Sequence, residues 1–193
     1  MPSQIYVPSL PVARGRLVAA GATHLTIPGV AITAQLTAAL VANTVRYFPI
    51  LVLSDCTIDQ LLIAVTAASG GGTTARLGIY NASVDWVPGT LILDAGTVAV
   101  DGNGNKTIAI SQALAPGRYY LALNSDSTPT IRLMRGSLAQ PLILSTISGN
   151  ALITALTAAQ VYAVFPSPGT AIDTVTSSTT PFEYGIFCRL SAG

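Results

Sequence analysis

TVAVDGNGNKTIAI, the stretch Thr97–Ile110, is the strongest local indication of the fold in this sequence. Two short runs of alternating apolar residues flank the segment DGNGN, in which Asn and Gly tolerate the positive φ angles that a tight loop needs. The pattern predicts a β-hairpin, with Thr97–Val100 and Lys106–Ile110 as its strands and Asp101–Asn105 as its loop.

Short apolar segments separated by turn residues continue on both sides of this stretch. The cluster SGGGTT at Ser69–Thr74 is a loop, because three glycines hold an extended strand poorly. Asp94-Ala95-Gly96 is predicted to be a turn between two short strands, Leu91–Leu93 and Thr97–Val100. The other strands are expected at Val45–Leu53, Thr57–Thr66, Ala75–Tyr80, Arg118–Asn124, Thr130–Met134 and Phe182–Leu190.

Alternation within these segments predicts which residues face the core. In Arg118–Asn124, Tyr119, Leu121 and Leu123 share one face, opposite Tyr120 and Ala122. The last strand carries four residues on one face, namely Phe182, Tyr184, Ile186 and Cys188.

Two segments fit the strand pattern less well. Pro49 lacks a backbone donor, so Val45–Leu53 is expected to be an edge or bulged strand. Ala151–Gln160 is expected to be a short helix or a loop. Taken together, the segments predict an all-β chain with a β-sandwich or jelly-roll-like fold rather than a helix-containing class.

The first 28 residues differ from the rest and are predicted to be an extended N-terminal arm, with residues 29–193 forming the sandwich domain. Prolines at four positions disfavour helix there (Pro2, Pro8, Pro11 and Pro28). Isolated apolar residues suit an arm that lies on another surface, and these candidate assembly residues are Ile5, Tyr6, Val7 and Leu10. The alternative is a disordered tail.

The composition is apolar and sparsely charged. Hydrophobic residues make up 50% of the chain and charged residues 9%, against about 25% charged in an average soluble domain. A membrane protein, or a protein whose outside is buried against neighbours, would have this composition. The most apolar window, Ile27–Leu53, is interrupted by polar residues and by Pro49, which argues against a membrane helix and favours assembly with neighbours.

Charge and cysteine patterns exclude several other classes. Basic residues are spread singly and Lys106 is the only lysine, so no nucleic-acid partner is expected. The N-terminus lacks a basic region followed by an apolar one, so synthesis in the cytoplasm is expected. Cys56 and Cys188 match no zinc or redox spacing and are expected to be free core residues, unless neighbouring strands bring them together as a disulfide.

Motifs for catalysis or metal binding are weak. The single histidine, His24, has no second histidine with which to build a zinc site. Asp101, Asn103 and Asn105 alternate like the start of a calcium loop, but an EF-hand requires Gly where Lys106 stands and an acid where Gln112 stands. No nucleophile elbow, phosphate loop or dinucleotide motif occurs. We therefore expect no enzyme activity, no metal and no cofactor, although sequence alone leaves paired carboxylates for glycan cleavage open as a weaker alternative.

One loop could bind a ligand. Trp86, on the segment Asn81–Gly89 with Asn81 and Asp85, could stack on a sugar or enter a partner's pocket, or it could fold back over the end of the sandwich. Both alternatives remain open at this point.

The middle of the chain resembles a module of tailed-bacteriophage virion proteins, found in capsid decoration, head-fibre and tail-fibre proteins. Three parts carry the resemblance in order: Thr57–Thr66 (TIDQLLIAVT), Ala75–Asn81 (ARLGIYN), and Pro88–Leu123, which contains LDAGTV, DGNGNK and PGRYYLAL. They span about a third to two fifths of the chain. The N-terminal arm and the region after Arg135 lie outside it.

The resemblance implies a non-enzymatic structural protein of the virion, made in the host cytoplasm. Members of the family act as oligomers, often trimers, so the implied partners are other copies of the chain and other virion proteins. We expect assembly through apolar interfaces and through the arm. The alternative is a receptor- or carbohydrate-binding module of a phage tail that uses the loop around Trp86.

Overall fold

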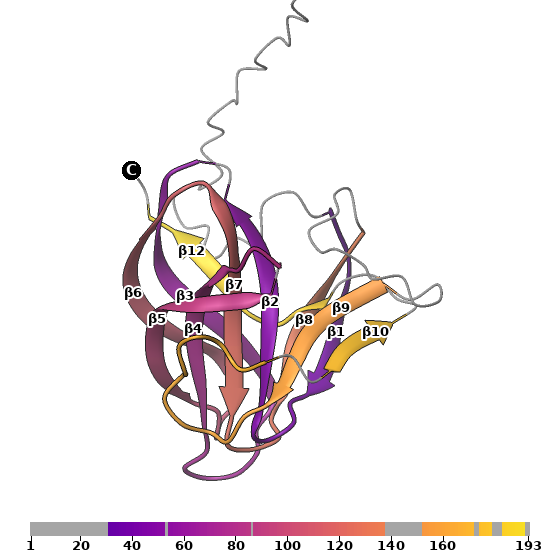
Figure 1. The fold of residues 1–193 in the computed structure, drawn as a ribbon. Coiled ribbons are helices and arrows are strands. Elements are labelled where there is room, and N and C mark those ends of the chain that lie inside the picture. The colour runs from indigo at the N-terminus through magenta and orange to yellow at the C-terminus, as the bar shows by residue number, and fades with distance from the viewer. Residues whose placement is uncertain are drawn as a thin grey trace, which may run out of the picture.

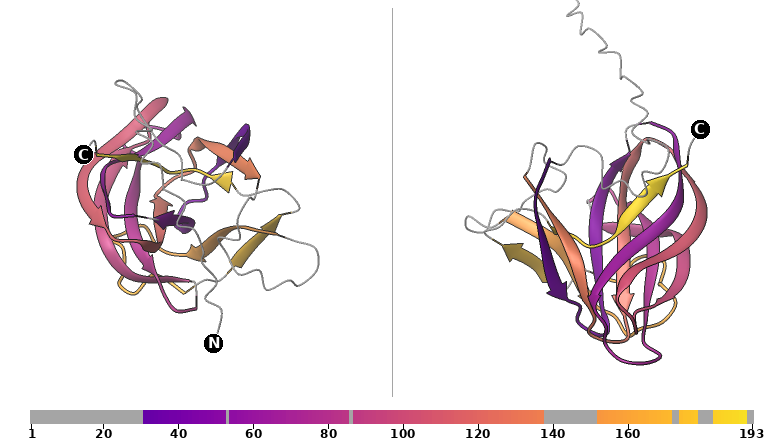
Figure 2. Two further views of the ribbon diagram at one scale, coloured as in Figure 1. Left: turned by 90° about the horizontal axis from the view of Figure 1, so that it is seen from above. Right: turned by 180° about the vertical axis from the view of Figure 1, so that it is seen from behind.

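A computed structural model gives the fold and describes residues 31–52, 54–85, 87–137, 152–171, 174–178 and 183–191. These residues form two antiparallel sheets that pack face to face, and they contain no helix (Figures 1 and 2). The predicted all-β sandwich is therefore confirmed. Among the described residues no helix is long and apolar enough to cross a membrane. The predicted arm, residues 1–28, lies outside the described residues.

The first sheet, called sheet A, has the strand order β1-β8-β3-β12, with β6 also paired to β3 and β11 also paired to β8. Its strands are β1 (Ala31–Ala39), β3 (Cys56–Ala67), β6 (Gly104–Leu114), β8 (Thr130–Ser137), β11 (Glu183–Tyr184) and β12 (Phe187–Leu190).

The second sheet, called sheet B, has the strand order β10-β9-β2-β7-β4-β5. Its strands are β2 (Thr44–Val52), β4 (Thr74–Ala82), β5 (Pro88–Ala99), β7 (Gly117–Ser125), β9 (Leu152–Ala159) and β10 (Thr174–Ser178). Most consecutive strands lie in different sheets, so most connections cross from one layer to the other.

The predicted hairpin at Thr97–Ile110 is wrong as a strand pair. β5 pairs with β4 in sheet B, whereas β6 pairs with β3 in sheet A, so the loop between them crosses the sandwich. Val98, Ile108 and Ile110 pack against the same core cluster from the two layers. Because strands facing each other across a sandwich show the same alternation as strands paired in a hairpin, the sequence pattern does not distinguish the two.

The turn predicted at Asp94-Ala95-Gly96 is instead a bulge within one long strand, β5. Leu77 pairs with Gly96 and Gly78 with Asp94, which leaves Ala95 as an extra residue. Gly96 has a φ of 88°, and its N–H donates to Asp94 Oδ1 at 3.0 Å. A Gly at positive φ is typical of such bulges, so the turn residues bend the strand without ending it.

Two strands differ from the sequence prediction near the ends of the chain. Ala151–Gln160 is neither helix nor loop, because Leu152–Ala159 forms β9 and pairs with β2. The predicted strand Phe182–Leu190 is divided, with β11 paired to β8 and β12 to β3. At the break, a Cβ on Gly185 would lie 2.8 Å from side-chain carbons of Ile131 and Leu133.

β1 was not predicted as a strand, and β2 is more central in its sheet than its proline suggested. In sheet order β2 lies between β9 and β7. Its pairing with β9 nevertheless ends at Tyr47, so at Pro49 the described partner is β7 alone, through Tyr120.

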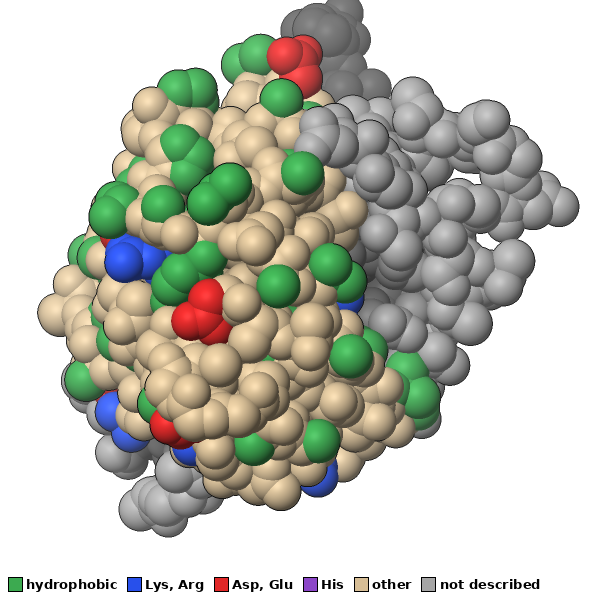
Figure 3. All heavy atoms as spheres, turned by 90° about the horizontal axis from the view of Figure 1, so that it is seen from below, with side chains coloured by type: hydrophobic (Ala, Val, Ile, Leu, Met, Phe, Trp, Pro, Cys, Tyr) green, Lys and Arg blue, Asp and Glu red, His purple; other side chains and the backbone are tan. Residues whose placement is uncertain are grey.

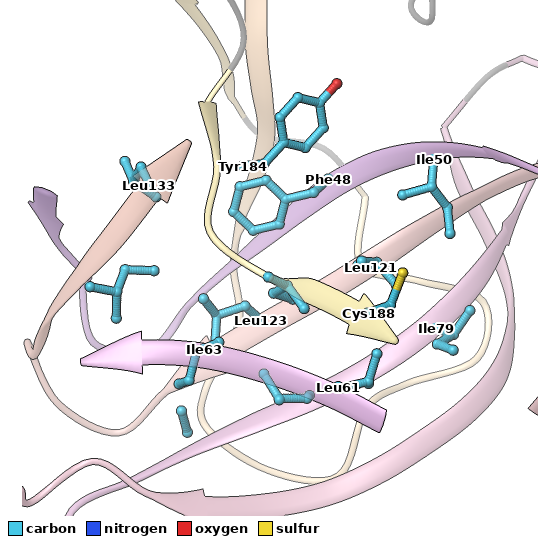
Figure 4. Packing of buried hydrophobic residues seen from close by; sticks show 14 of the residues in the cluster. Phe48, Ile50, Leu61, Ile63, Ile79, Leu121, Leu123, Leu133, Tyr184 and Cys188 are labelled. Atoms are coloured by element: carbon cyan, nitrogen blue, oxygen red, sulfur yellow. The ribbon is translucent and has the colours of Figure 1, made fainter. Parts of the chain in front are cut away.

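The main core lies between the sheets, and Figure 4 shows its side chains meeting from both layers. Leu121 and Leu123 of β7 point into it, while Tyr120 and Ala122 point to a second cluster on the outer face of sheet B, which confirms the predicted alternation. Tyr184, Ile186 and Cys188 also belong to the main core, as predicted for that face, and Phe182 lies outside the described residues. Both thiols are free, and burial raises the pKa of Cys188 to about 12.

Candidate assembly surface

Five connections meet at one end of the sandwich, here called the lower pole, which lies at the bottom of Figure 1 and faces the viewer in Figure 3. Backbone hydrogen bonds join them, including those from Leu40 N–H to Pro129 C=O and from Val100 N–H to Thr73 C=O. The connections are residues 40–43, 68–73, 100–103, 126–129 and 160–171.

Asn43 joins two of these connections and the end of β7. Its φ of 57° lies in the left-handed region, which Asn tolerates better than most residues. Its N–H donates to the carbonyl of Ser125 and its C=O accepts from Gln160 N–H, both at 2.9 Å. Its side-chain Oδ1 accepts from Tyr162 N–H at 2.8 Å. The loop of residues 40–43 is thereby fixed to the start of the connection 160–171.

Asp126 and Tyr162 fix the start of β4. The Asp126 carboxylate accepts from the Thr74 N–H at 3.0 Å and from the Thr74 hydroxyl at 2.9 Å. The Thr74 hydroxyl is also 2.7 Å from the Tyr162 hydroxyl. These bonds satisfy backbone and hydroxyl groups that would otherwise need water.

Asp101 and Asn103, from the segment that resembles the start of a calcium loop, hold a neighbouring loop. Asn103 Oδ1 accepts from Ala68 N–H at 2.9 Å, and Asp101 Oδ2 accepts from Gly72 N–H at 3.4 Å. Among the described residues no group of three or more His, Cys, Asp or Glu side chains gathers as a metal site. The alternating Asp101–Asn105 pattern is thus explained by bonds to the β3–β4 loop.

The connection 160–171, here called the strap, crosses the outer face of sheet B. Phe165 is 3% exposed and lies edge-on to Tyr80, with ring centroids 6.0 Å apart. A Cβ on Gly78 would be 2.8 Å from the Phe165 ring, so only glycine leaves room for it. The Tyr80 hydroxyl donates to Pro166 C=O, and the Tyr47 hydroxyl accepts from Thr170 N–H.

A partly buried ion pair anchors the same segment. Arg76 Nη1 lies 2.7 Å from Asp94 Oδ2, and both side chains are 17% exposed. Asp94 Oδ2 also accepts from the Phe165 N–H at 3.2 Å. At the start of the strap, Asn124, which is fully buried, donates to Gln160 C=O at 3.0 Å.

Burial under the strap suppresses ionisation of the tyrosines there. Desolvation raises the pKa of Tyr47 and of Tyr80, and it raises the pKa of Tyr120 to about 12. Their hydroxyls therefore remain neutral donors and acceptors over the whole physiological range of pH.

The lower pole exposes apolar side chains on this fixed backbone. Val41 and Val161 at the pole are 55% and 77% exposed, and Val164, next to Phe165 on the strap, is 67% exposed. The five connections carry two charged residues, Asp101 and Asp126, and both are engaged by backbone N–H groups of the neighbouring segment. Figure 3 shows the result: hydrophobic side chains are spread over the pole and charged ones are few.

The predicted ligand loop lies away from this pole, beyond the end of β4. The side-chain Oδ1 of Asn81 accepts a hydrogen bond from Thr90 N–H and so holds the end of β4 to β5. Asp85 is exposed, and its N–H donates to Ser83 Oγ at 3.2 Å. Val84 is 92% exposed between them. Trp86 lies outside the described residues, as do the arm residues Ile5, Tyr6, Val7 and Leu10 and the histidine His24.

Four of the described carboxylates, those of Asp59, Asp94, Asp101 and Asp126, contact neighbouring residues. Asp94 is bound to Arg76, and Asp59 Oδ1 lies 2.7 Å from Arg189 Nε. Asp101 and Asp126 accept backbone N–H groups. Each of these carboxylates has a structural contact.

Sequence reasoning missed the strap and the lower pole. The place of Phe165 above Gly78 depends on residues 87 positions apart in the chain, and no local pattern reports it. The Gly at the centre of ARLGIY is the one available signal, because Gly within a strand often marks the close approach of another group.

A scan against protein-family models found no match, and searches of curated proteins and of solved structures found none either.

Proposed function

We propose that this chain is a structural component of a bacteriophage particle, a capsid-decoration or fibre protein that assembles through apolar contacts and an N-terminal arm. The lower pole carries the proposal: a rigid, nearly uncharged end of the sandwich that exposes Val41 and Val161. The sequence resemblance supports the setting in a virion, and the low charge of the chain supports burial against neighbours.

The rigid backbone of the lower pole is the reason for favouring an interface over a chance exposure of its valines. An apolar side chain on a backbone that is already ordered loses little further freedom when it is buried by a partner. Val161 lies between Gln160 and Tyr162, both of which hydrogen-bond to Asn43. The pole is therefore preorganised for contact.

The test replaces the pole valines with a charge. We expect Val41→Asp/Val161→Asp to lower self-association or incorporation into particles, because a carboxylate at a closing apolar interface must be desolvated. Val84→Asp is the matched control, because Val84 is also highly exposed but lies on the loop 83–87. Sedimentation velocity of the full chain measures association, and circular dichroism checks the fold. Equal behaviour of the two variants and the wild type would remove the pole from the proposal.

Deleting residues 1–28 tests the arm. We expect the shortened chain to keep its fold and to lose incorporation into particles. Normal incorporation with failed host attachment would favour the alternative, a receptor- or carbohydrate-binding module. The exposed Val84, two residues before Trp86 in the sequence, gives that alternative its best candidate loop, and Trp86→Ala followed by a glycan-binding assay tests it directly.

A further inference from the structure

In the part of the chain that the structure describes, no strand pairs with the outer edge of β1 in sheet A. Among the described residues β1 pairs with β8 alone, from Ala31 opposite Ser137 to Ala39 opposite Thr130. A strand at the edge of a sheet presents unpaired N–H and C=O groups, which form a template for another strand.

The edge strands β5, β10 and β6 carry features that discourage pairing. β5 begins at Pro88, has Gly96 at positive φ and shows three register shifts. β10 is five residues long and contains a register shift. β6 carries Lys106 and contacts β5 of the opposite sheet. Proline, bulges, short length and lysine are devices that protect edges.

β1 lacks these devices over the segment AQLTA, Ala34–Ala38. The segment has no charge and no proline, and its one irregularity lies before it, between Ile32 and Ala34. At its far end Ala39 C=O already accepts from the Arg46 side chain at 3.1 Å. Five consecutive residues are thus available for a partner strand.

The segment is complementary to itself in antiparallel orientation. With Leu36 opposite the Leu36 of a second copy, Ala34 falls opposite Ala38 and Gln35 opposite Thr37. Leu36 and Ala38 pack against the core, whereas Gln35 and Thr37 are exposed on the other face. In this register every core-facing residue meets a core-facing residue, and every polar residue meets a polar one.

We propose that β1 pairs antiparallel with β1 of a second copy of this chain, centred on Leu36, and joins the two A sheets into one continuous sheet. The contact is two-fold and uses the same residues of both copies. The inference rests on the proposed function, because it names one of the contacts through which the chain would assemble.

The experiment uses charge at the paired positions. Gln35→Glu/Thr37→Glu places carboxylates opposite each other twice across the two-fold axis. Within one chain these carboxylates lie near Arg132, which donates to Gln35 Oε1 at 3.3 Å, so the strand itself is not weakened. We expect the dissociation constant of self-association to rise by roughly tenfold or more at low salt, and by less at high salt.

A second variant tests the register. Gln35→Lys/Thr37→Glu places a lysine opposite a glutamate in the proposed register, so self-association should equal or exceed that of the wild type. In a pairing centred on Gln35, two lysines would meet and association would fall. Ala109→Glu/Ser111→Glu is the matched control, because both residues are exposed with the same spacing on β6 of the same sheet.

Sedimentation velocity and equilibrium measure the association, and the unfolding midpoint confirms that each variant folds. If the wild type associates and the double glutamate variant on β1 associates equally well, the β1 pairing is overturned while the assembly proposal stands. Dissociation of the lysine–glutamate variant overturns the register. A wild type that stays monomeric overturns both proposals.

Discussion

The contact of Phe165 with Gly78 offers the sharpest test of how the strap is held. Phe165 is 3% exposed, and its ring is 2.8 Å from the position that a Cβ on Gly78 would occupy. Phe165→Ala removes a buried ring and the edge-on contact with Tyr80, so it should lower the free energy of unfolding by about 3 kcal/mol.

Gly78→Ala acts on the same contact from the other side. The added methyl group would overlap the ring and would lie 2.9 Å from Leu93 C=O. We expect this overpacking to lower the free energy of unfolding by about 2 kcal/mol. In a Phe165→Ala background the ring is gone and only the crowding against Leu93 remains. There Gly78→Ala should lower the free energy of unfolding by about 1 kcal/mol less than in the wild type.

Urea unfolding of the four proteins, followed by circular dichroism and by tyrosine fluorescence, measures this double-mutant cycle. The double variant should lose about 1 kcal/mol less free energy of unfolding than the sum of the two single losses. Strictly additive effects would show that Phe165 does not lie over Gly78, and the described strap would then be misplaced.

Four further outcomes follow from the contacts. Asn43→Gly should keep the backbone at positive φ but lose the hydrogen bond from Tyr162 N–H. Asn43→Ala should lose the hydrogen bond and also strain the backbone, so it should lower the free energy of unfolding by more, about 1–2 kcal/mol. Urea unfolding ranks the two variants. Asp94→Asn should lower the free energy of unfolding by about 2–3 kcal/mol, because it leaves the partly buried Arg76 without its charged partner. Asp59→Asn, at the more exposed pair with Arg189, should have a much smaller effect in the same assay. Native Cys188 should resist a thiol reagent at pH 8 and react on unfolding, because burial raises its pKa to about 12; rapid native labelling at this residue would contradict its buried position. Burial also raises the pKa of Tyr120 and Tyr184 to about 12 from 10.0. The free energy of unfolding should therefore be full below pH 10 and should fall as the pH rises towards 12. Urea midpoints that stay constant over that range would contradict this prediction.

The sequence predicted the strands whose alternation is strict. In β7 the residues Leu121 and Leu123 face the main core and Tyr120 and Ala122 face the second cluster, because a strand that is buried on both sides still alternates. β3 and β4 were likewise expected close to their observed positions, since an apolar run and a glycine-rich loop define their ends.

Ala-rich strands were the main failures. β1 (AITAQLTAA) and β9 (LITALTAA) are rich in Ala and Thr, and Ala is a good helix former that gives no clear signal of a strand. Their extended form comes from pairing with β8 and with β2. Tertiary contacts therefore decide these two segments.

Turn residues were also misread, because a turn signal gives the position of a bend but not its consequence. Asp94-Ala95-Gly96 bends one strand without ending it, and DGNGN connects two sheets rather than two paired strands. The lower pole and the strap follow from these same crossings, so they could not be predicted from local patterns.

The measurement that tests the account most directly is the mass of the purified full-length chain in solution as a function of concentration. A nearly uncharged pole and an open, uncharged edge strand predict reversible self-association, with a weight-average mass that rises above the 19.7 kDa of one chain. Sedimentation equilibrium from about 1 to about 200 μM covers the affinities expected of such contacts. A constant mass of one chain over the whole range would contradict the central claim.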